Sequence, residues 1–130
     1  MKEFKHSNPD YCDPPGAFRD ILAHPFDKIN KSIEKVVFKE HRFAFFYWVR
    51  WYRELLKKGR VINPPLLVTI DYHRDLASSE SEKEELNDID KYNLAELVQF
   101  CWTRMNPMND GHILSAAYLN IIGDIVLLNR

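Results

Sequence analysis

The chain has 130 residues, of which 45% are hydrophobic and 13% aromatic, so it is long and apolar enough to form one folded domain or part of one. Its formal net charge of −1 gives no electrostatic reason to expect a nucleic-acid or anionic-membrane partner. No apolar run approaches the roughly 20 residues of a membrane span, and the N-terminus has no apolar signal core. The two cysteines, Cys12 and Cys101, lie far apart, which favours reduced thiols and a cytoplasmic protein.

The first part of the chain is expected to be irregular. Four prolines interrupt residues 1–31, and we interpret this stretch as an N-terminal lead-in to a domain over residues 32–130. Residues 33–38 are predicted to form a strand, and residues 43–58 a helix that ends at Gly59. Aromatic side chains recur in this helix at spacings of three and four, which is typical of a stripe packed into a core. They are Phe43, Phe46, Tyr47 and Trp51.

The remaining elements alternate between strands and helices. They are a buried strand over 66–70, helices over 93–105 and 110–122, and a last strand over 124–128. Asn93 is expected to cap the first of these helices, and Gly123 to end the second. The acidic residues 78–90 are interpreted as a solvated loop with a helical turn. This alternation predicts an α/β fold with a parallel sheet of about three strands, flanking helices and an exposed sheet edge.

A polar cluster, Asp71-Tyr72-His73-Arg74-Asp75, begins where the strand over 66–70 ends. Ligands collect at the carboxyl ends of strands in parallel sheets. The spacing of two places Asp71, His73 and Asp75 on one side if the chain stays extended. Two carboxylates and an imidazole suit a divalent cation such as Mn²⁺, Zn²⁺ or Fe²⁺. The alternative is a solvated loop that contains these residues without a metal.

Two further histidines are candidates for the same site. His41 follows the first strand as the polar cluster follows the second, so it would reach the same metal if the strands are neighbours. Otherwise it is a structural or solvated side chain. His112 opens a predicted helix and is a candidate proton carrier, because an imidazole titrates near neutral pH. The alternative is that Asp110 caps this helix and His112 is a first-turn residue.

The order of these motifs resembles the arginase–deacetylase superfamily, in which a His follows one strand and Asp-x-His-x-Asp another, with a further His elsewhere. More closely, the chain is similar to a branch that includes peptide arginases, which hydrolyse arginine side chains within peptides to ornithine and urea. The resemblance spans about residues 33–128. Its matching pieces are residues 36–41 (Val-Val-Phe-Lys-Glu-His), the aromatic helix that follows, residues 71–75, and residues 109–114 (Asn-Asp-Gly-His-Ile-Leu).

The resemblance implies a metal-dependent hydrolase of C–N bonds, of the ureohydrolase or peptide-arginase type. Carried over residue by residue, it implies that His41, Asp71, His73 and Asp75 bind a pair of Mn²⁺ ions, with Asp71 between them. His112 matches a catalytic or substrate-facing His. The implied substrate is a guanidine-containing small molecule or a peptide arginine, attacked at the guanidinium carbon by a hydroxide that bridges the two metals.

The chain departs from the family pattern in one respect. Family members have a later Asp-x-Asp after another strand, and this sequence ends before such a segment. Asp88-Ile89-Asp90 comes too early to replace it and is expected to be exposed. Asp71 and Asp75 alone would leave about +2 uncompensated beside two divalent cations. We therefore expect the N-terminal half of an arginase-like fold, a degenerate copy, or a subunit completed by a partner or an oligomer.

Two other functions remain open from the sequence. A deacetylase-type hydrolase is the nearest enzymatic alternative. A non-catalytic α/β binding or assembly module, which buries its open sheet edge against a partner, is the alternative from a different class.

Overall fold

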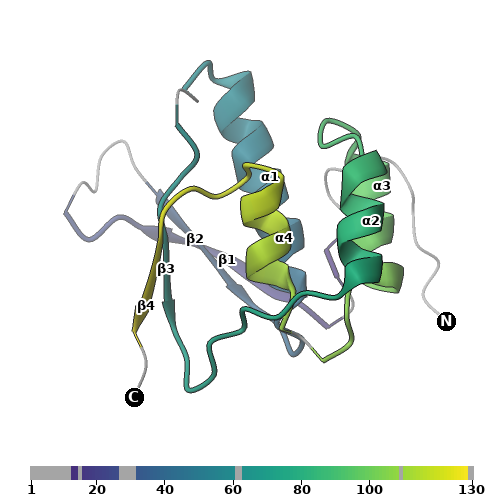
Figure 1. Cartoon of the computed structure of the whole chain (residues 1–130). Helices are drawn as coiled ribbons and strands as arrows, with labels where there is room; N and C mark the ends of the chain where they lie inside the picture. Colours follow the sequence, from purple (N-terminus) through teal and green to yellow (C-terminus); the bar gives the residue numbers. More distant parts are fainter. Residues whose placement is uncertain (1–12, 15, 27–31, 61–62, 109, 129–130) are drawn as a thin grey trace, which may run out of the picture.

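The computed structural model of the chain describes residues 13–14, 16–26, 32–60, 63–108 and 110–128. They form a mixed α/β structure with two small sheets (Figure 1). The elements in chain order are β1 (Phe18–Ala23), β2 (Ser32–Val37), α1 (Phe43–Lys57), β3 (Leu67–Ile70), α2 (Glu80–Asp88), α3 (Leu94–Gln99), the π-helix η2 (Phe100–Arg104), α4 (His112–Tyr118) and β4 (Ile125–Leu128). Among the described helices, none is both long enough and apolar enough to cross a membrane.

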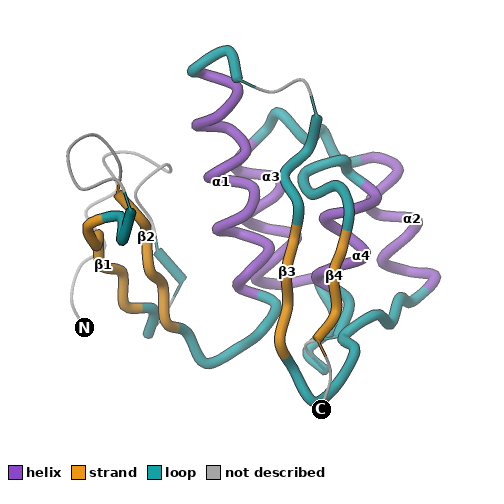
Figure 2. Tube along the Cα trace, turned by 90° about the vertical axis from the view of Figure 1, so that its left-hand side faces the viewer, coloured by secondary structure: helices purple, strands orange, loops and turns teal. Residues whose placement is uncertain are grey.

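The strands form two separate pairs. β1 and β2 are antiparallel, with Phe18 opposite Val37, and β3 and β4 are parallel, with Leu67 opposite Ile125. The prediction of about three parallel strands is therefore not confirmed, because β2 pairs with β1 instead of joining β3 and β4. In Figure 2 the β3–β4 pair lies in front of the helices, and the β1–β2 hairpin lies to one side of α1.

Strand β1 corrects the expectation that residues 1–31 are irregular. The stretch Phe18–Ala23 contains no proline, and Pro14 and Pro25 lie outside the strand. Prolines are excluded from strand interiors but are tolerated at strand ends, so the proline count concealed a strand between them. The predicted strand over 33–38 is confirmed as β2, as are those over 66–70 and 124–128 as β3 and β4.

Helix α1 lies at the centre of the core and ends as the sequence predicts. Gly59 has a φ of 63°, its N–H donates to the Leu56 carbonyl at 2.9 Å, and the Arg60 N–H donates to the Leu55 carbonyl at 3.0 Å. This pair of bonds is the Schellman motif, which favours glycine at the left-handed position.

The predicted aromatic stripe is confirmed at three of its four positions, since Phe43, Phe46 and Tyr47 are buried while Trp51 is partly exposed. Buried side chains from α1, α3, η2, α4 and the segment after α4 make up most of the core. The largest are Phe45, Phe46, Tyr47, Leu97, Phe100, Met105, Ile113 and Ile121.

Residues 78–90 were predicted to be a solvated loop with a helical turn, but the helical part is longer than one turn, because α2 occupies most of the stretch. Ser79 Oγ accepts the Glu82 N–H at 3.2 Å, and the Glu82 carboxylate accepts the Ser79 N–H at 3.3 Å. This reciprocal capping box starts the helix despite its acidic composition. Glu82 is only 3% exposed and also accepts the N–H of Asn106, so it ties α2 to the loop before α4. Asp88 and Asp90 are exposed, as predicted.

The predicted helix over 93–105 is confirmed as α3 continued by η2. Asn93 caps it, because its side chain accepts the N–H groups of Ala95 and Glu96 at 3.1 and 3.4 Å. Capping by Asn is expected where a helix begins with unpaired N–H groups.

Helix α4 is shorter than predicted, and Gly123 does not end it. Asn120, with a φ of 54°, takes the left-handed position after the helix, and its N–H donates to the Ala117 carbonyl at 2.9 Å. Gly123 has a different role: a Cβ there would lie 2.9 Å from the carbonyl oxygen of Pro64, and its N–H donates to Pro65 at 2.8 Å. The glycine therefore lets the chain enter β4 close to the segment that leads into β3.

The β3–β4 pair has one covered and one open face. Alternate residues of both strands face inward, as the period of two requires. The outward-facing side chains are all aliphatic and between 42% and 75% exposed: Val68, Ile70, Val126 and Leu128. Parallel sheets are normally covered on both faces, so this outer face is unusual.

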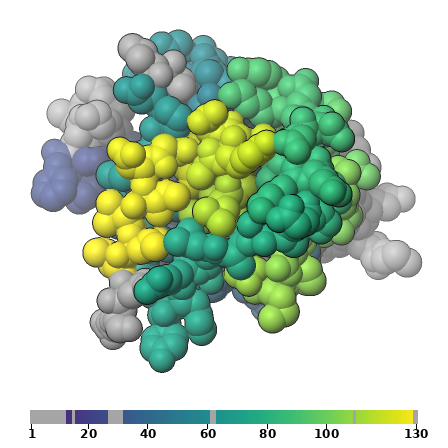
Figure 3. Space-filling model, viewed as in Figure 1, coloured from purple at the N-terminus to yellow at the C-terminus, as the bar shows by residue number. Residues whose placement is uncertain are grey.

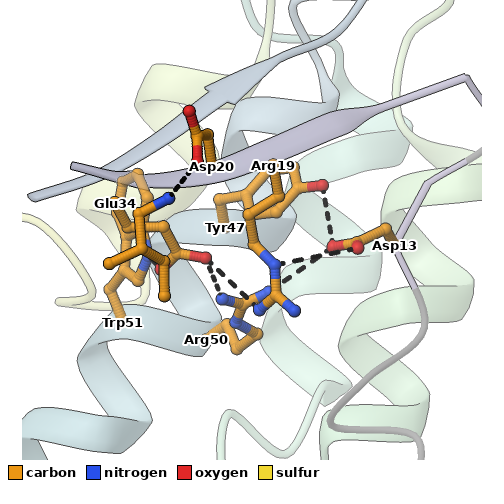
Figure 4. Close-up of polar contacts among 8 residues, drawn as sticks. Asp13, Arg19, Asp20, Glu34, Tyr47, Arg50 and Trp51 are labelled. Carbon is orange, nitrogen blue, oxygen red and sulfur yellow. Dashed lines mark hydrogen bonds and ion pairs between the residues drawn. The ribbon is translucent and has the colours of Figure 1, made fainter.

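A polar cluster joins the hairpin to α1 (Figure 4). It consists of Asp13, Arg19, Glu34, Tyr47, Arg50 and Trp51, and we call it the hairpin cluster. Arg50 contacts Glu34 and also Asp13, the latter at 3.5 Å, while Arg19 lies 3.4 Å from Glu34 and 4.0 Å from Asp13. Two cations thus face two carboxylates.

The hydrogen bonds of this cluster shift two pKa values. Burial, with a hydrogen bond to Asp13, raises the pKa of Tyr47. Burial acts to raise the pKa of Glu34, but hydrogen bonds from Trp51 and Arg50 and the charge of Arg50 outweigh it and lower the pKa. Glu34 therefore stays ionised between its cationic neighbours.

Candidate metal site

His41 lies in the turn between β2 and α1. The turn is closed by two backbone bonds, from the Phe43 N–H to Glu40 at 3.0 Å and from the Ala44 N–H to His41 at 2.9 Å. Cys101, from η2, donates its thiol hydrogen to the Arg42 carbonyl at 3.2 Å. Burial raises the pKa of Cys101 to about 12, so the group remains a protonated donor.

Asp71 begins a turn directly after β3. Its side chain accepts the His73 N–H at 3.1 Å, a local bond that Asp favours in turns. This bond lowers the pKa of Asp71, and the neighbouring His41 charge adds to the effect, so the carboxylate stays ionised. The chain is therefore not extended from Asp71 onward, and the alternation that would have placed Asp71, His73 and Asp75 on one side is lost.

Asp75 lies in the left-handed region, with a φ of 49°. Asp tolerates this conformation better than most residues, because its short side chain bonds locally. Two residues later, the Ala77 N–H donates to the Asp110 carbonyl at 3.0 Å, which ties the end of the turn to the loop before α4. The segment that follows β3, drawn in teal, lies on the surface of the molecule in Figure 3.

His41, Asp71 and Asp75 come together at the meeting point of these two turns. His41 Nδ1 lies 3.0 Å from Asp75 Oδ2 and 3.7 Å from Asp71 Oδ2. One ligand atom from each of the three residues lies within 4.8 Å of the others. β2 and β3 are not neighbours in one sheet, yet the turns after them converge. Among the described residues, this is the group of three or more ligand side chains close enough to share a metal ion.

His73 is not brought into this group. Its side chain is exposed, and its ring contacts that of Tyr72 edge-on, with the centroids 5.1 Å apart. It lines a groove that opens beside His41 and Asp75. Its role as a metal ligand stays a prediction.

His112 is the first residue of α4 and is only 5% exposed. Its ring contacts that of His41 edge-on, at a centroid distance of 6.2 Å, and stacks on that of Trp48, at 5.6 Å. Asp110 does not cap the helix, because Gly111 takes that position and the Asp110 side chain accepts a bond from Asn106. Sequence analysis missed Trp48, since nothing in the spacing of α1 relates it to a histidine 64 positions later.

A groove of about 770 Å³ opens beside His41 and Asp75. Its walls come from the turn after β2, the turn after β3 and the loop before α4. The lining residues are Lys39, His41, His73, Arg74, Asp75, Leu76, Ala77, Met108 and Asp110. His112 is not among them, which is consistent with its burial.

The donor set of the three residues fits one divalent ion. One imidazole nitrogen and carboxylate oxygens are ligands that Mn²⁺, Fe²⁺ and Zn²⁺ accept, and three protein ligands leave positions open for water. Asp71 and Asp75 carry two negative charges, which balance one divalent cation. The same contacts without a metal are a His–Asp hydrogen bond that joins two turns.

The free thiol of Cys101 is buried, and Cys12 lies outside the described residues.

Comparisons of the chain with protein families, with curated proteins and with solved structures found no match. The resemblance to the arginase–deacetylase superfamily therefore stays a prediction.

Proposed function

We propose that this chain binds a divalent metal ion through His41, Asp71 and Asp75, and that it is part of a metal-dependent hydrolase of C–N bonds. The observation that carries the proposal is the convergence of these three ligand side chains, from turns 30 or more positions apart, to within 4.8 Å. The motif order, which resembles that of peptide arginases, supports a guanidine-containing small molecule or a peptide arginine as substrate.

The charge of the site favours one bound ion over the binuclear Mn²⁺ centre that the resemblance implies. Two carboxylates neutralise one divalent cation, and His73 does not lie with the other three ligands. A second ion would require further carboxylates from a partner or from another segment.

The residues around the site have separable roles. A bound divalent ion would supply a nucleophile by lowering the pKa of water. Asp71 and Asp75 supply negative charge, and the His73 amide keeps Asp71 ionised by lowering its pKa. His112 contacts His41 edge-on and stacks on Trp48, so we assign it as a positioning residue for the His41 ring.

The test is Mn²⁺ titration calorimetry at pH 7 on the parent chain and on Asp71→Asn. We expect one Mn²⁺ per chain in the parent and at least a roughly 100-fold weaker affinity in the variant, because removing a carboxylate leaves the cation charge unbalanced. Asp88→Asn, an exposed carboxylate outside the site, is the matched control and should bind as the parent does. Equal affinity in the parent and Asp71→Asn would contradict the proposal.

Hydrolysis is tested separately, by urea release from an arginine-containing peptide with and without Mn²⁺. The proposal predicts release that requires Mn²⁺ and is lost in Asp75→Asn. Mn²⁺ binding without urea release would support the metal site but contradict the proposed hydrolysis of a guanidine-containing substrate.

The outer face of the β3–β4 pair favours a second candidate function, an assembly module. Its four aliphatic side chains form an exposed apolar surface on a parallel sheet, a kind of surface that proteins normally cover. The candidate predicts self-association that increases with concentration in analytical ultracentrifugation and is lost in Ile70→Lys. A monomer at all concentrations would contradict it.

A further inference from the structure

The charged residues that line the groove beside the candidate metal site differ in whether they have partners among the described residues. Asp75 pairs with His41 at 3.0 Å, and the Asp110 side chain accepts a bond from Asn106 at 2.9 Å. Lys39 and Arg74 also line the groove, and neither forms an ion pair with any described residue. Among the described residues, Asp75 and Asp110 thus have hydrogen-bonding partners, whereas Lys39 and Arg74 have no ion-pair partner.

A bound metal would make this imbalance larger. One divalent ion cancels the charges of Asp71 and Asp75, so the remaining charged groups of the groove are Lys39, Arg74 and Asp110. Two positive charges against one negative leave the groove positive next to the metal. Field lines focus in such a concave site, which raises the local concentration of anions.

We propose that the groove binds an anionic group of the substrate, a carboxylate or a phosphate, through Lys39 and Arg74. This inference rests on the proposed function, because it assigns the anion to the substrate of the same metal site. The Arg74 guanidinium suits two-point contact with such a group, and Lys39 adds a point charge from the opposite turn. The anion would hold one end of the substrate in the groove while the other end lies at His41, Asp71 and Asp75.

The experiment is a thermal-unfolding titration of the Mn²⁺-saturated chain with acetate and with methyl phosphate at constant ionic strength. A ligand that binds only the folded state raises the melting temperature with a saturable dependence on concentration. We expect such a rise in the parent, with an apparent Kd that is roughly tenfold weaker in Lys39→Met and in Arg74→Met. The lower of the acetate and methyl phosphate Kd values identifies which anion the groove prefers.

Lys58→Met is the matched control, because Lys58 is exposed at the far end of α1 and does not line the groove. It should bind the anions as the parent does. Melting curves without anion show whether each variant folds. No saturable rise in the parent, or equal Kd values in the parent, Lys39→Met and Arg74→Met, would overturn the inference.

A Mn²⁺ titration of the same variants separates this inference from the proposed function. Lys39→Met and Arg74→Met should retain Mn²⁺ affinity, since neither residue is among the three proposed ligands. Mn²⁺ binding with no effect of these variants on the anions contradicts the anion site alone. No Mn²⁺ binding by the parent contradicts the proposed function, and an anion titration in EDTA then shows whether Lys39 and Arg74 bind anions without a metal.

Discussion

Two polar clusters join segments far apart in this chain, and they differ in their charge balance. In the hairpin cluster, Arg19 and Arg50 face Asp13 and Glu34, so two positive charges meet two negative charges. At the candidate metal site, Asp71 and Asp75 share a single imidazole, that of His41. The first cluster is complete without a further ion, whereas the second carries an excess of negative charge.

This difference in charge balance indicates that the hairpin cluster stabilises the fold, whereas the candidate metal site can bind a cation. A carboxylate with a cationic partner and an indole donor, like Glu34, has its charge and hydrogen bonds satisfied within the protein. Two carboxylates beside one histidine repel each other unless a cation lies between them.

The largest expected effect is the response of Asp75→Asn to Mn²⁺. At a Mn²⁺ concentration of 100 times Kd, the free energy of unfolding of the parent should rise by about 2.7 kcal/mol. In Asp75→Asn the rise should be absent, while the stability in EDTA changes by less than about 0.5 kcal/mol because the His41–Asp75 pair is partly solvated. Urea unfolding measures both. Asp13→Asn, in the hairpin cluster, should keep the Mn²⁺-dependent rise of the parent. A rise that is kept in Asp75→Asn but lost in Asp13→Asn would reverse the roles of the two clusters.

Arg50→Met should destabilise the chain by about 2 kcal/mol, because it leaves Glu34 and Asp13 with fewer partners in a partly buried site. Mn²⁺ should not restore the loss. Urea unfolding with and without Mn²⁺ checks this, and Arg60→Met, an exposed residue, is the control with an expected change below about 0.5 kcal/mol. If Arg50→Met is as stable as the control, the hairpin cluster does not hold the hairpin to α1.

The pKa of Glu34 is lowered in the folded chain from an ordinary value of 4.5, which predicts a pH dependence. Its contribution is present above pH 4.5 and is lost as the pH falls through the lower folded pKa. Glu34→Gln should therefore cost about 1 kcal/mol at pH 7, and the difference from the parent should shrink below pH 4.5. Unfolding curves from pH 3 to 7 measure this, and a difference that stays constant with pH would contradict the assignment.

The smallest effect concerns the capping box of α2. Ser79→Ala removes the acceptor for the Glu82 N–H and should cost roughly 0.5–1 kcal/mol without changing Mn²⁺ affinity. Ser78→Ala, on an exposed residue directly before the capping residue, is the control. A change in Mn²⁺ affinity would mean that α2 and the loop before α4 control the metal site.

The elements with strong local signals were predictable from the sequence. Helix α1 has both an apolar stripe and Gly59 at its end, and Asn93 caps α3 as its side chain and position suggest. Only a helical turn was predicted where α2 lies, because the segment is strongly acidic and polar, although Ser79 and Glu82 have the capping-box spacing that starts a longer helix. Gly123 was assigned as a helix end, but Asn120 takes the left-handed position and Gly123 is required by its approach to Pro64.

Pairing between strands is less predictable than the strands themselves. Strand β2 was recognised, but its partner β1 lies in a stretch bounded by prolines, and pairing depends on contacts that no local pattern records. At the site, His41, Asp71 and Asp75 were identified from residue type and strand ends. His73 was grouped with them on the assumption of an extended chain, which the Asp71 turn removes.

The most direct measurement is the anomalous diffraction signal of Mn²⁺ in crystals of the parent chain grown with Mn²⁺. We expect one peak within coordination distance, roughly 2 Å, of His41, Asp71 and Asp75. We expect no peak at Asp13 or Glu34, whose charges are already balanced. A peak at the hairpin cluster, or none at the three proposed ligands, would contradict the proposed metal site.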